Sequence, residues 1–140
     1  MTILGSVDFD AKEVQQKIID KMNVVIERSK NIIPYTTKDG RYNDESKEHI
    51  GWWTNGFWGG ILWQLYQVTK KDVYKEQAEW VEKEMDRALF NHREMDHDSG
   101  FRWLPTSLAA YKFNQNKESY NRLWIAADNL AGRVNPAGNF

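Results

Sequence analysis

The chain has 140 residues, of which 28% are charged, and a formal net charge of −1 at pH 7. A chain of this length can bury one hydrophobic core, but its balanced charge offers no basic face for nucleic acid or a membrane surface. The absence of cysteine excludes disulfides and thiolate chemistry, and no apolar run approaches the roughly 18 residues of a membrane span. The opening MTILGSVDFD has no signal-peptide pattern, so we expect a soluble, cytoplasmic protein.

The first predicted helix begins at Asp10 and ends near Asn31. Asp10 and Glu13 have the spacing of a helix-starting capping box. Apolar residues then recur at steps of three and four along one face, as in an amphipathic helix: Val14, Ile18, Met22, Val25 and Ile26. Residues 34–50 are polar and rich in turn formers, which predicts a long loop, either functional or a solvated crossing. His49, within this loop, has no partner visible in the sequence.

A tryptophan- and glycine-rich stretch, GWWTNGFWGGILWQLY, covers residues 51–66. Indole supplies a large, flat apolar face, and glycine lets the backbone approach another group closely. A buried contact between helices uses both residue types, and so does the aromatic wall of a ligand cavity. The polar Thr54 and Asn55 at the centre of the stretch favour the cavity. A second helix is expected from Phe57 to Val68.

Three further helices are predicted in the second half of the chain. Asp72 is placed to cap the third helix, whose apolar residues are Val73, Tyr74, Trp80, Val81, Met85 and Leu89. Residues 91–103 are expected to be non-helical, and Pro105 suits the first turn of a fourth helix at 105–113. After a break at 114–116, a fifth helix carries Tyr120, Leu123, Trp124, Ala127 and Leu130.

The sequence pattern of the second and third predicted helices recurs in the fourth and fifth. Tyr66 corresponds to Tyr111, 45 residues later, and Tyr74 corresponds to Tyr120, 46 residues later. Two helices per repeat at this period indicate stacked helical hairpins. HEAT-like repeats have a similar length, but aromatic, glycine-bearing loops recurring at one end of the helices favour a closed ring. The expected fold is an all-α α/α toroid, of which about two and a half hairpins are present. Such a part of a ring should expose apolar surface and self-associate.

Asp96, His97 and Asp98 form a concentrated set of proton-handling groups outside the predicted helices. A carboxylate held against aromatic walls can act as a general acid or base. Alternatively, the two aspartates cap the turn and the fourth helix, and His97 is exposed. A metal site made by His92, Asp96 and His97 is a weaker hypothesis because it matches no strong ligand spacing. Arg102 could bind a substrate carboxylate or pair with one of the aspartates.

Two of these motifs together resemble the unsaturated glucuronyl hydrolases, glycoside hydrolase family 88, and more distantly the unsaturated rhamnogalacturonyl hydrolases, family 105. The motifs are WTNGFWGGILW, from residue 53, and DHDSGF, from residue 96. The resemblance covers roughly residues 12–134 and implies an (α/α)6 barrel. It also implies release of a 4,5-unsaturated uronic acid from the non-reducing end of lyase-made oligosaccharides, which derive from glycosaminoglycans or other polysaccharides. No cofactor is expected.

The resemblance implies a reaction by hydration, in which an acid protonates C4, water adds at C5 and a hemiketal collapses. Asp98 matches the family's first essential aspartate, His97 a substrate-contacting histidine and Trp53 the ring near the uronate. The remaining expected substrate contacts are Asn55, Trp58 and Arg102. The family's principal acid/base aspartate lies further along than residue 140, so we expect an amino-terminal part of the catalytic domain that is inactive alone. The alternatives are another α/α-toroid sugar enzyme and a non-catalytic helical repeat that binds glycan or protein.

Overall fold

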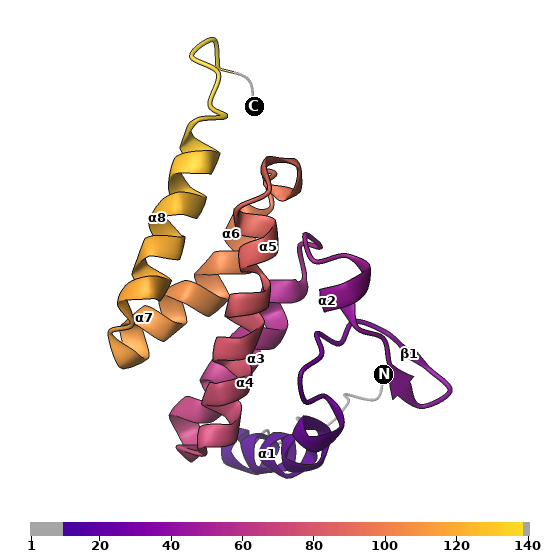
Figure 1. Cartoon of the computed structure of the whole chain (residues 1–140). Coiled ribbons are helices and arrows are strands. Elements are labelled where there is room, and N and C mark those ends of the chain that lie inside the picture. The colour runs from indigo at the N-terminus through magenta and orange to yellow at the C-terminus, as the bar shows by residue number, and fades with distance from the viewer. Residues whose placement is uncertain (1–9, 139–140) are drawn as a thin grey trace, which may run out of the picture.

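The structure, a computed structural model, describes residues 10–138 and is helical almost throughout (Figure 1). The longer helices are α1 (Ala11–Arg28), α3 (Asn55–Thr69), α4 (Asp72–Glu84) and α8 (Lys117–Ala131). The shorter ones are α2 (Glu45–Glu48), α5 (Asp86–Leu89), η1 (His92–Glu94), α6 (Ser99–Trp103), η2 (Leu104–Leu108) and α7 (Ala109–Asn114). The predicted all-α class is confirmed. None of the described helices is long and apolar enough to cross a membrane.

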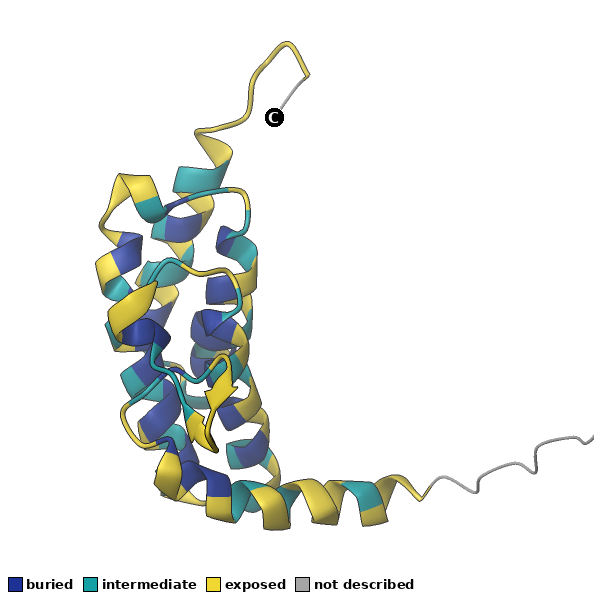
Figure 2. Ribbon diagram, turned by 90° about the vertical axis from the view of Figure 1, so that its right-hand side faces the viewer, coloured by how far each residue is buried: buried dark blue, intermediate teal, exposed yellow. Residues whose placement is uncertain are grey.

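Helix α1 lies across one end of the α3–α4 hairpin (Figure 1 and Figure 2). Asp10 begins it as predicted, because its Oδ1 accepts hydrogen bonds from two backbone N–H groups of the first turn, at 2.9 and 3.4 Å. Val25 and Ile26 are buried, whereas Ile18 is 51% exposed, since the first half of the helix projects beyond the hairpin. The helix ends at Arg28, slightly earlier than predicted.

The prediction of a loop at 34–50 is wrong in part. Thr37–Lys38 (β1) and Arg41–Tyr42 (β2) pair antiparallel in a short hairpin. Helix α2 follows it because the side chain of Asp44 caps its first turn. Elements this short have no periodicity to detect in a sequence, so turn chemistry alone marks them.

The α3–α4 hairpin holds the main core. Trp63, Tyr74 and Val81 are fully buried there. The other buried members of this core are Ile26, Ile33, Leu62, Leu65, Ala78, Met85, Ala109 and Ala110. In Figure 2 the buried positions face inward between the upright helices. Asp72, predicted to cap α4, is instead its first residue, where its charge still favours the helix dipole. A smaller cluster joins α5, α6 and α8 around Trp103.

Helices α6, η2 and α7 run on from one another as one helical segment, residues 99–114, which we call the 99–114 rod. The helix predicted at 105–113 therefore begins earlier in the structure than predicted, at residue 99. Pro105 lies inside the rod, in the π-helical turn η2. This wider turn fits proline, which has no N–H to donate, and the Thr106 hydroxyl donates to the Arg102 carbonyl at 2.6 Å.

The predicted repeat appears in the turns between paired helices. Lys70, between α3 and α4, has a left-handed φ of 56°, and Gln115, between α7 and α8, has a φ of 54°. Each donates its N–H, at 2.8 Å, to a tyrosine carbonyl one turn earlier, that of Tyr66 or Tyr111. The two turns lie 45 residues apart. The α3–α4 and α7–α8 hairpins therefore share one turn geometry.

A buried carboxylate joins three helical segments. Glu82 of α4 is 1% exposed, and its oxygens accept hydrogen bonds from Ser107 in η2 at 2.5 Å and from Ser119 in α8 at 2.8 Å. Arg122 lies 3.9 Å away and forms a bidentate pair with Asp86 at 2.6 and 2.7 Å. Burial raises the pKa of Glu82, and the two hydroxyls and Arg122 offset part of that rise. These bonds fix α4, the rod and α8 relative to one another.

Candidate active site

The two loops that carry the sequence motifs meet where α3 and α6 begin. Arg102 of α6 lies between the loops and is fully buried. Its guanidinium donates to the carbonyl of Gly51 at 2.5 Å and to that of Glu94 at 2.7 Å. It also donates to Asp96 Oδ1 at 2.9 Å and to Ser99 Oγ at 3.2 Å. Burial lowers the pKa of Arg102, and nearby carboxylates, Asp96 foremost, oppose that shift. One side chain therefore ties both loops together.

The substrate-binding role predicted for Arg102 needs correction. Its side chain is 0% exposed, and four of its contacts are to the chain itself. No part of the guanidinium faces solvent for a substrate carboxylate. The sequence left two alternatives for Arg102, binding a substrate carboxylate or pairing with an aspartate, and in the structure it pairs with Asp96. Arg102 is a positioning residue.

Exposed aromatic rings cover the surface at this junction. Trp53 contacts Phe57 and Phe101 edge to face, with ring centroids 5.8 and 5.6 Å apart. Phe57 and Phe101 are 5.9 Å apart, and the three rings are 36% to 48% exposed. We call these three residues the aromatic platform, since their partly exposed rings form one apolar cluster at the surface. The two phenylalanines were not predicted as site residues, although each belongs to one of the motifs.

Asp98 lies at the start of α6, one turn before Phe101, so the two residues share a side of the helix. The Asp98 side chain is 29% exposed and makes no capping hydrogen bond. Its backbone N–H donates to Asp96 Oδ1 at 3.0 Å, so the capping alternative holds for Asp96 rather than Asp98. His97 Nε2 lies 3.7 Å from the Asp98 carboxylate, and its side chain is 80% exposed. Asp98 is therefore partly exposed, and His97 is largely exposed, as the capping alternative expected for His97.

Of two further predicted substrate contacts, Asn55 is buried and Trp58 is partly buried. Asn55 is 1% exposed, and its Nδ2 donates to the carbonyls of His49 and Ile50, both at 3.0 Å. Trp58 packs against the main core, and its indole N–H is buried without a partner in the described part of the chain. In this structure Asn55 fixes the turn that presents Trp53, and Trp58 contributes to the core.

The glycines of the tryptophan-rich stretch serve a contact between helices. A Cβ on Gly56 would lie 2.4 Å from the Phe101 carbonyl oxygen and 2.5 Å from Arg102 Cα. Gly59 and Gly60 meet side chains of the 99–114 rod in the same way. Glycine therefore lets α3 and the rod approach closely. The interpretation as a buried contact between helices is confirmed for the glycines, and the ligand-cavity interpretation stays a prediction for the partly exposed Trp53.

The weaker metal hypothesis is not supported by the geometry. Within residues 10–138, His92, Asp96 and His97 do not gather as a group of ligands. The group that does gather lies on α2 and is Glu45, Glu48 and His49.

Curated proteins of similar sequence carry related names. The chain is 41% identical, over 93 residues, to the unsaturated chondroitin disaccharide hydrolase of Streptococcus pneumoniae. The aligned stretch covers 63% of this chain and 22% of that protein. It is 32% identical over 105 residues to the protein of the same name from Streptococcus pyogenes serotype M1, and this alignment covers 74% of the chain and 26% of that protein. It is 27% identical over 124 residues to the unsaturated glucuronyl hydrolase of Bacillus sp. (strain GL1), covering 85% and 32%. No family model and no solved structure matches the chain.

The resemblance predicted from the two motifs is therefore confirmed by relatives with these names. The chain spans between 22% and 32% of the length of the three relatives.

Proposed function

We propose that the chain forms the amino-terminal part of an α/α-toroid glycoside hydrolase of family 88. The proposed enzyme removes a 4,5-unsaturated uronic acid from the non-reducing end of lyase-made oligosaccharides. One observation supports the proposal: the two motifs meet in space, because Trp53 of the first contacts Phe101 of the second, one helical turn after Asp98. The names of the relatives supply the substrate class. The shared turn geometry of the two hairpins supports the toroid.

In the proposed reaction, C4 of the unsaturated ring takes a proton from the carboxyl pair formed by Asp98 and the second aspartate expected in the longer protein. Water adds its oxygen at C5 and returns a proton to that pair, and the resulting hemiketal collapses to release the rest of the oligosaccharide. Trp53 holds the flat ring, and His97, 3.7 Å from the Asp98 carboxylate, contacts the substrate. Arg102 and Asn55 hold the two loops in place. A second aspartate is expected in the longer protein, so residues 1–140 alone are expected to be inactive.

The test follows the ultraviolet absorbance of the conjugated uronate in unsaturated disaccharides, with a protein of the relatives' length that contains this chain. We expect the absorbance to fall, and Asp98→Asn to slow the fall by a hundredfold or more, on the order of a lost general acid. Asp39→Asn, in the turn of the β1–β2 hairpin, is the matched control and should keep full activity. An unchanged absorbance with every unsaturated disaccharide, or full activity in Asp98→Asn, would defeat the proposal.

A glycan-binding module without catalysis is the second candidate. The exposed aromatic platform favours it, because rings can stack on a sugar without an acid beside them. In that case the wild-type chain binds the disaccharide, Trp53→Ala abolishes this binding, Asp98→Asn leaves it intact, and the absorbance never changes. Turnover by the longer protein distinguishes the two candidates.

A further inference from the structure

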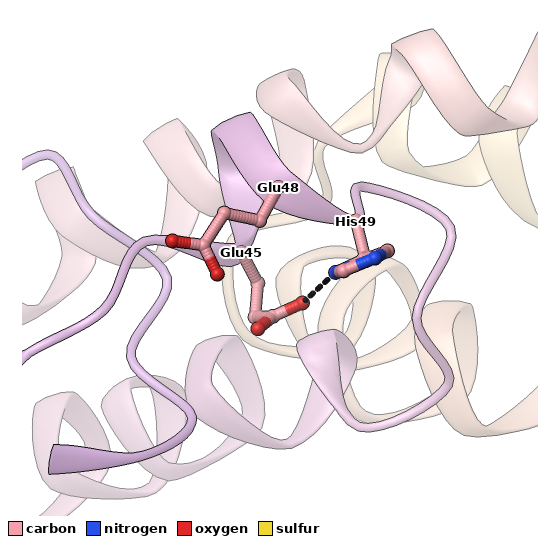
Figure 3. Close-up of side chains that lie close together, drawn as sticks. All are labelled: Glu45, Glu48 and His49. Atoms are coloured by element: carbon pink, nitrogen blue, oxygen red, sulfur yellow. Dashed lines mark ion pairs between the residues drawn. The ribbon is translucent and has the colours of Figure 1, made fainter.

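A second group of chemically reactive side chains lies on α2, away from Asp98. Glu45, Glu48 and His49 each offer one ligand atom, and these atoms lie within 4.8 Å of one another. Figure 3 shows the two carboxylates on α2 and the imidazole on the residue that directly follows this helix. The spacing of three and four residues puts all of them on one helical face. Within residues 10–138 it is the one group of at least three such ligands.

Glu45 distinguishes this group from an exposed acidic patch. Its side chain is only 5% exposed. Oε1 accepts a hydrogen bond from Asn43 Nδ2 at 2.6 Å, but Oε2 points toward His49 Nδ1 at 3.5 Å, beyond ordinary hydrogen-bond length. No lysine or arginine among the described residues pairs with Glu45. His49 pairs with Glu45 as a cation only when the imidazole is protonated, whereas a metal ion would bind both side chains with the imidazole neutral, and buried charges are normally paired or bound to a metal.

The surroundings leave room for an ion. A cavity of about 300 Å³ borders the three ligands and is walled by the rings of Tyr35 and Trp52. Those rings pack edge to face at 5.9 Å. The 3.5 Å between Glu45 Oε2 and His49 Nδ1 is close to the ~3.4 Å that separates two ligands of one tetrahedral zinc ion with bonds of about 2.1 Å.

We propose that Glu45, Glu48 and His49 bind a divalent transition-metal ion. One imidazole nitrogen with two carboxylates suits zinc better than magnesium or calcium, which prefer oxygen ligands alone. The His49 carbonyl accepts a hydrogen bond from Asn55 Nδ2 at 3.0 Å. A bound ion would therefore hold the segment that leads into Trp53 and α3. The site is independent of the proposed hydrolase activity.

The test titrates the wild-type chain with zinc chloride at pH 7.5 in a calorimeter. We expect one ion per chain, and we expect His49→Ala and Glu48→Gln each to weaken binding at least about tenfold, the scale of losing a group that supports a metal. Both side chains are exposed, so these changes should leave the fold intact, which circular dichroism checks. His92→Ala and His97→Ala, on the other two histidines, are matched controls and should bind as the wild type does.

Imidazole nitrogen spectra locate the ion directly. Zinc should shift the Nδ1 resonance of His49 and leave the imidazole resonances of His92 and His97 unchanged. Equimolar magnesium should not displace the bound zinc ion. The proposal is overturned if zinc does not bind, if His49→Ala binds as tightly as wild type, or if binding is lost in His92→Ala or His97→Ala.

Discussion

The α3–α4 and α7–α8 hairpins share a turn geometry and a sequence pattern, yet they differ in burial. Tyr74 on α4 is fully buried, and its hydroxyl donates to Asn23 Oδ1 at 2.9 Å. Its counterpart Tyr120 on α8 is 40% exposed, beside Trp124 at 54%. The first hairpin is covered by the end of α1 and by the 99–114 rod, whereas no described residue covers this face of α8. The same pattern thus gives a core or an open surface, depending on what packs against it.

The open face of α8 has a definite shape. Tyr120, Leu123, Trp124 and other apolar residues border a groove of about 350 Å³ between α6 and α8. An apolar groove of this kind is where association is expected. Self-association of the chain through this groove remains a prediction. Because the α3–α4 hairpin holds the main core, most of the free energy of unfolding should come from that hairpin.

The largest expected difference comes from truncating the two equivalent tyrosines. Tyr74→Ala should lower the free energy of unfolding by about 4 kcal/mol, because it leaves a cavity in the main core. Tyr120→Ala should lower it by less than about 1 kcal/mol, since the ring is already partly in water. Urea unfolding of both variants measures the contrast. Equal losses would mean that α8 is covered in solution.

The contact between α3 and the 99–114 rod gives the next largest effect. Gly56→Ala should cost about 3 kcal/mol, because the added methyl meets backbone atoms at 2.4 and 2.5 Å that cannot move aside. Gly100→Ala is the matched control: its Cβ meets only Leu104 Cδ1, at 3.7 Å, and alanine favours the helix by roughly 0.5–1 kcal/mol. Thermal unfolding of both variants should separate them clearly. A tolerated Gly56→Ala would disprove the close approach of the two helices.

Arg102→Lys tests the junction of the two loops. Lysine cannot reach both Gly51 and Asp96, so about 2 kcal/mol of unfolding free energy should be lost. Arg93→Lys, on an exposed side chain nearby, should change nothing measurable. Hydrogen exchange of the 49–54 and 94–99 backbone amides should quicken in Arg102→Lys alone. Unaltered exchange would show that the loops are held by other contacts.

The smallest effect is a pH dependence that comes from Glu82. Because burial raises its folded-state pKa above the ordinary value near 4.5, the folded chain binds this proton more tightly than the unfolded chain. Stability from this group is therefore full below the unfolded pKa and is lost as pH rises through the folded pKa. Glu82→Gln removes that loss, so its stability relative to wild type should increase with pH across this window. A constant difference in urea unfolding from pH 4 to pH 8 would contradict the shift.

The helices could be predicted where apolar residues recur over several turns. The pattern from Val14 to Ile26 predicted α1, and the spacing from Tyr66 to Tyr111 predicted two similar hairpins. The pattern failed where a helix depends on its neighbours. Residues 99–103 contain a glycine and too few turns to show a period, yet they are helical because Arg102 and Trp103 are packed against α3 and α8.

The candidate site could be predicted in part. The motifs pointed to Trp53 and Asp98, and in the structure Trp53 contacts Phe101, one helical turn after Asp98. Arg102 and Asn55 were predicted as substrate contacts because both are polar, and Asn55 lies within one motif while Arg102 directly follows the other. A sequence does not show whether a polar side chain faces solvent or the opposite loop, and here the Arg102 guanidinium donates to the carbonyl of Gly51 in the opposite loop.

The buried bonds of Glu82 set limits on the length of the chain. Ser107 lies in the π-helical turn, and removing one residue before it would rotate the serine by about 100° around the helix axis. Its hydroxyl would leave Glu82, and the α7–α8 hairpin would turn with it. A deletion of one residue within the 99–114 rod should therefore be harmful, whereas insertions in the exposed β1–β2 hairpin should be tolerated. Variation in length among related chains is expected at that hairpin and not in the rod.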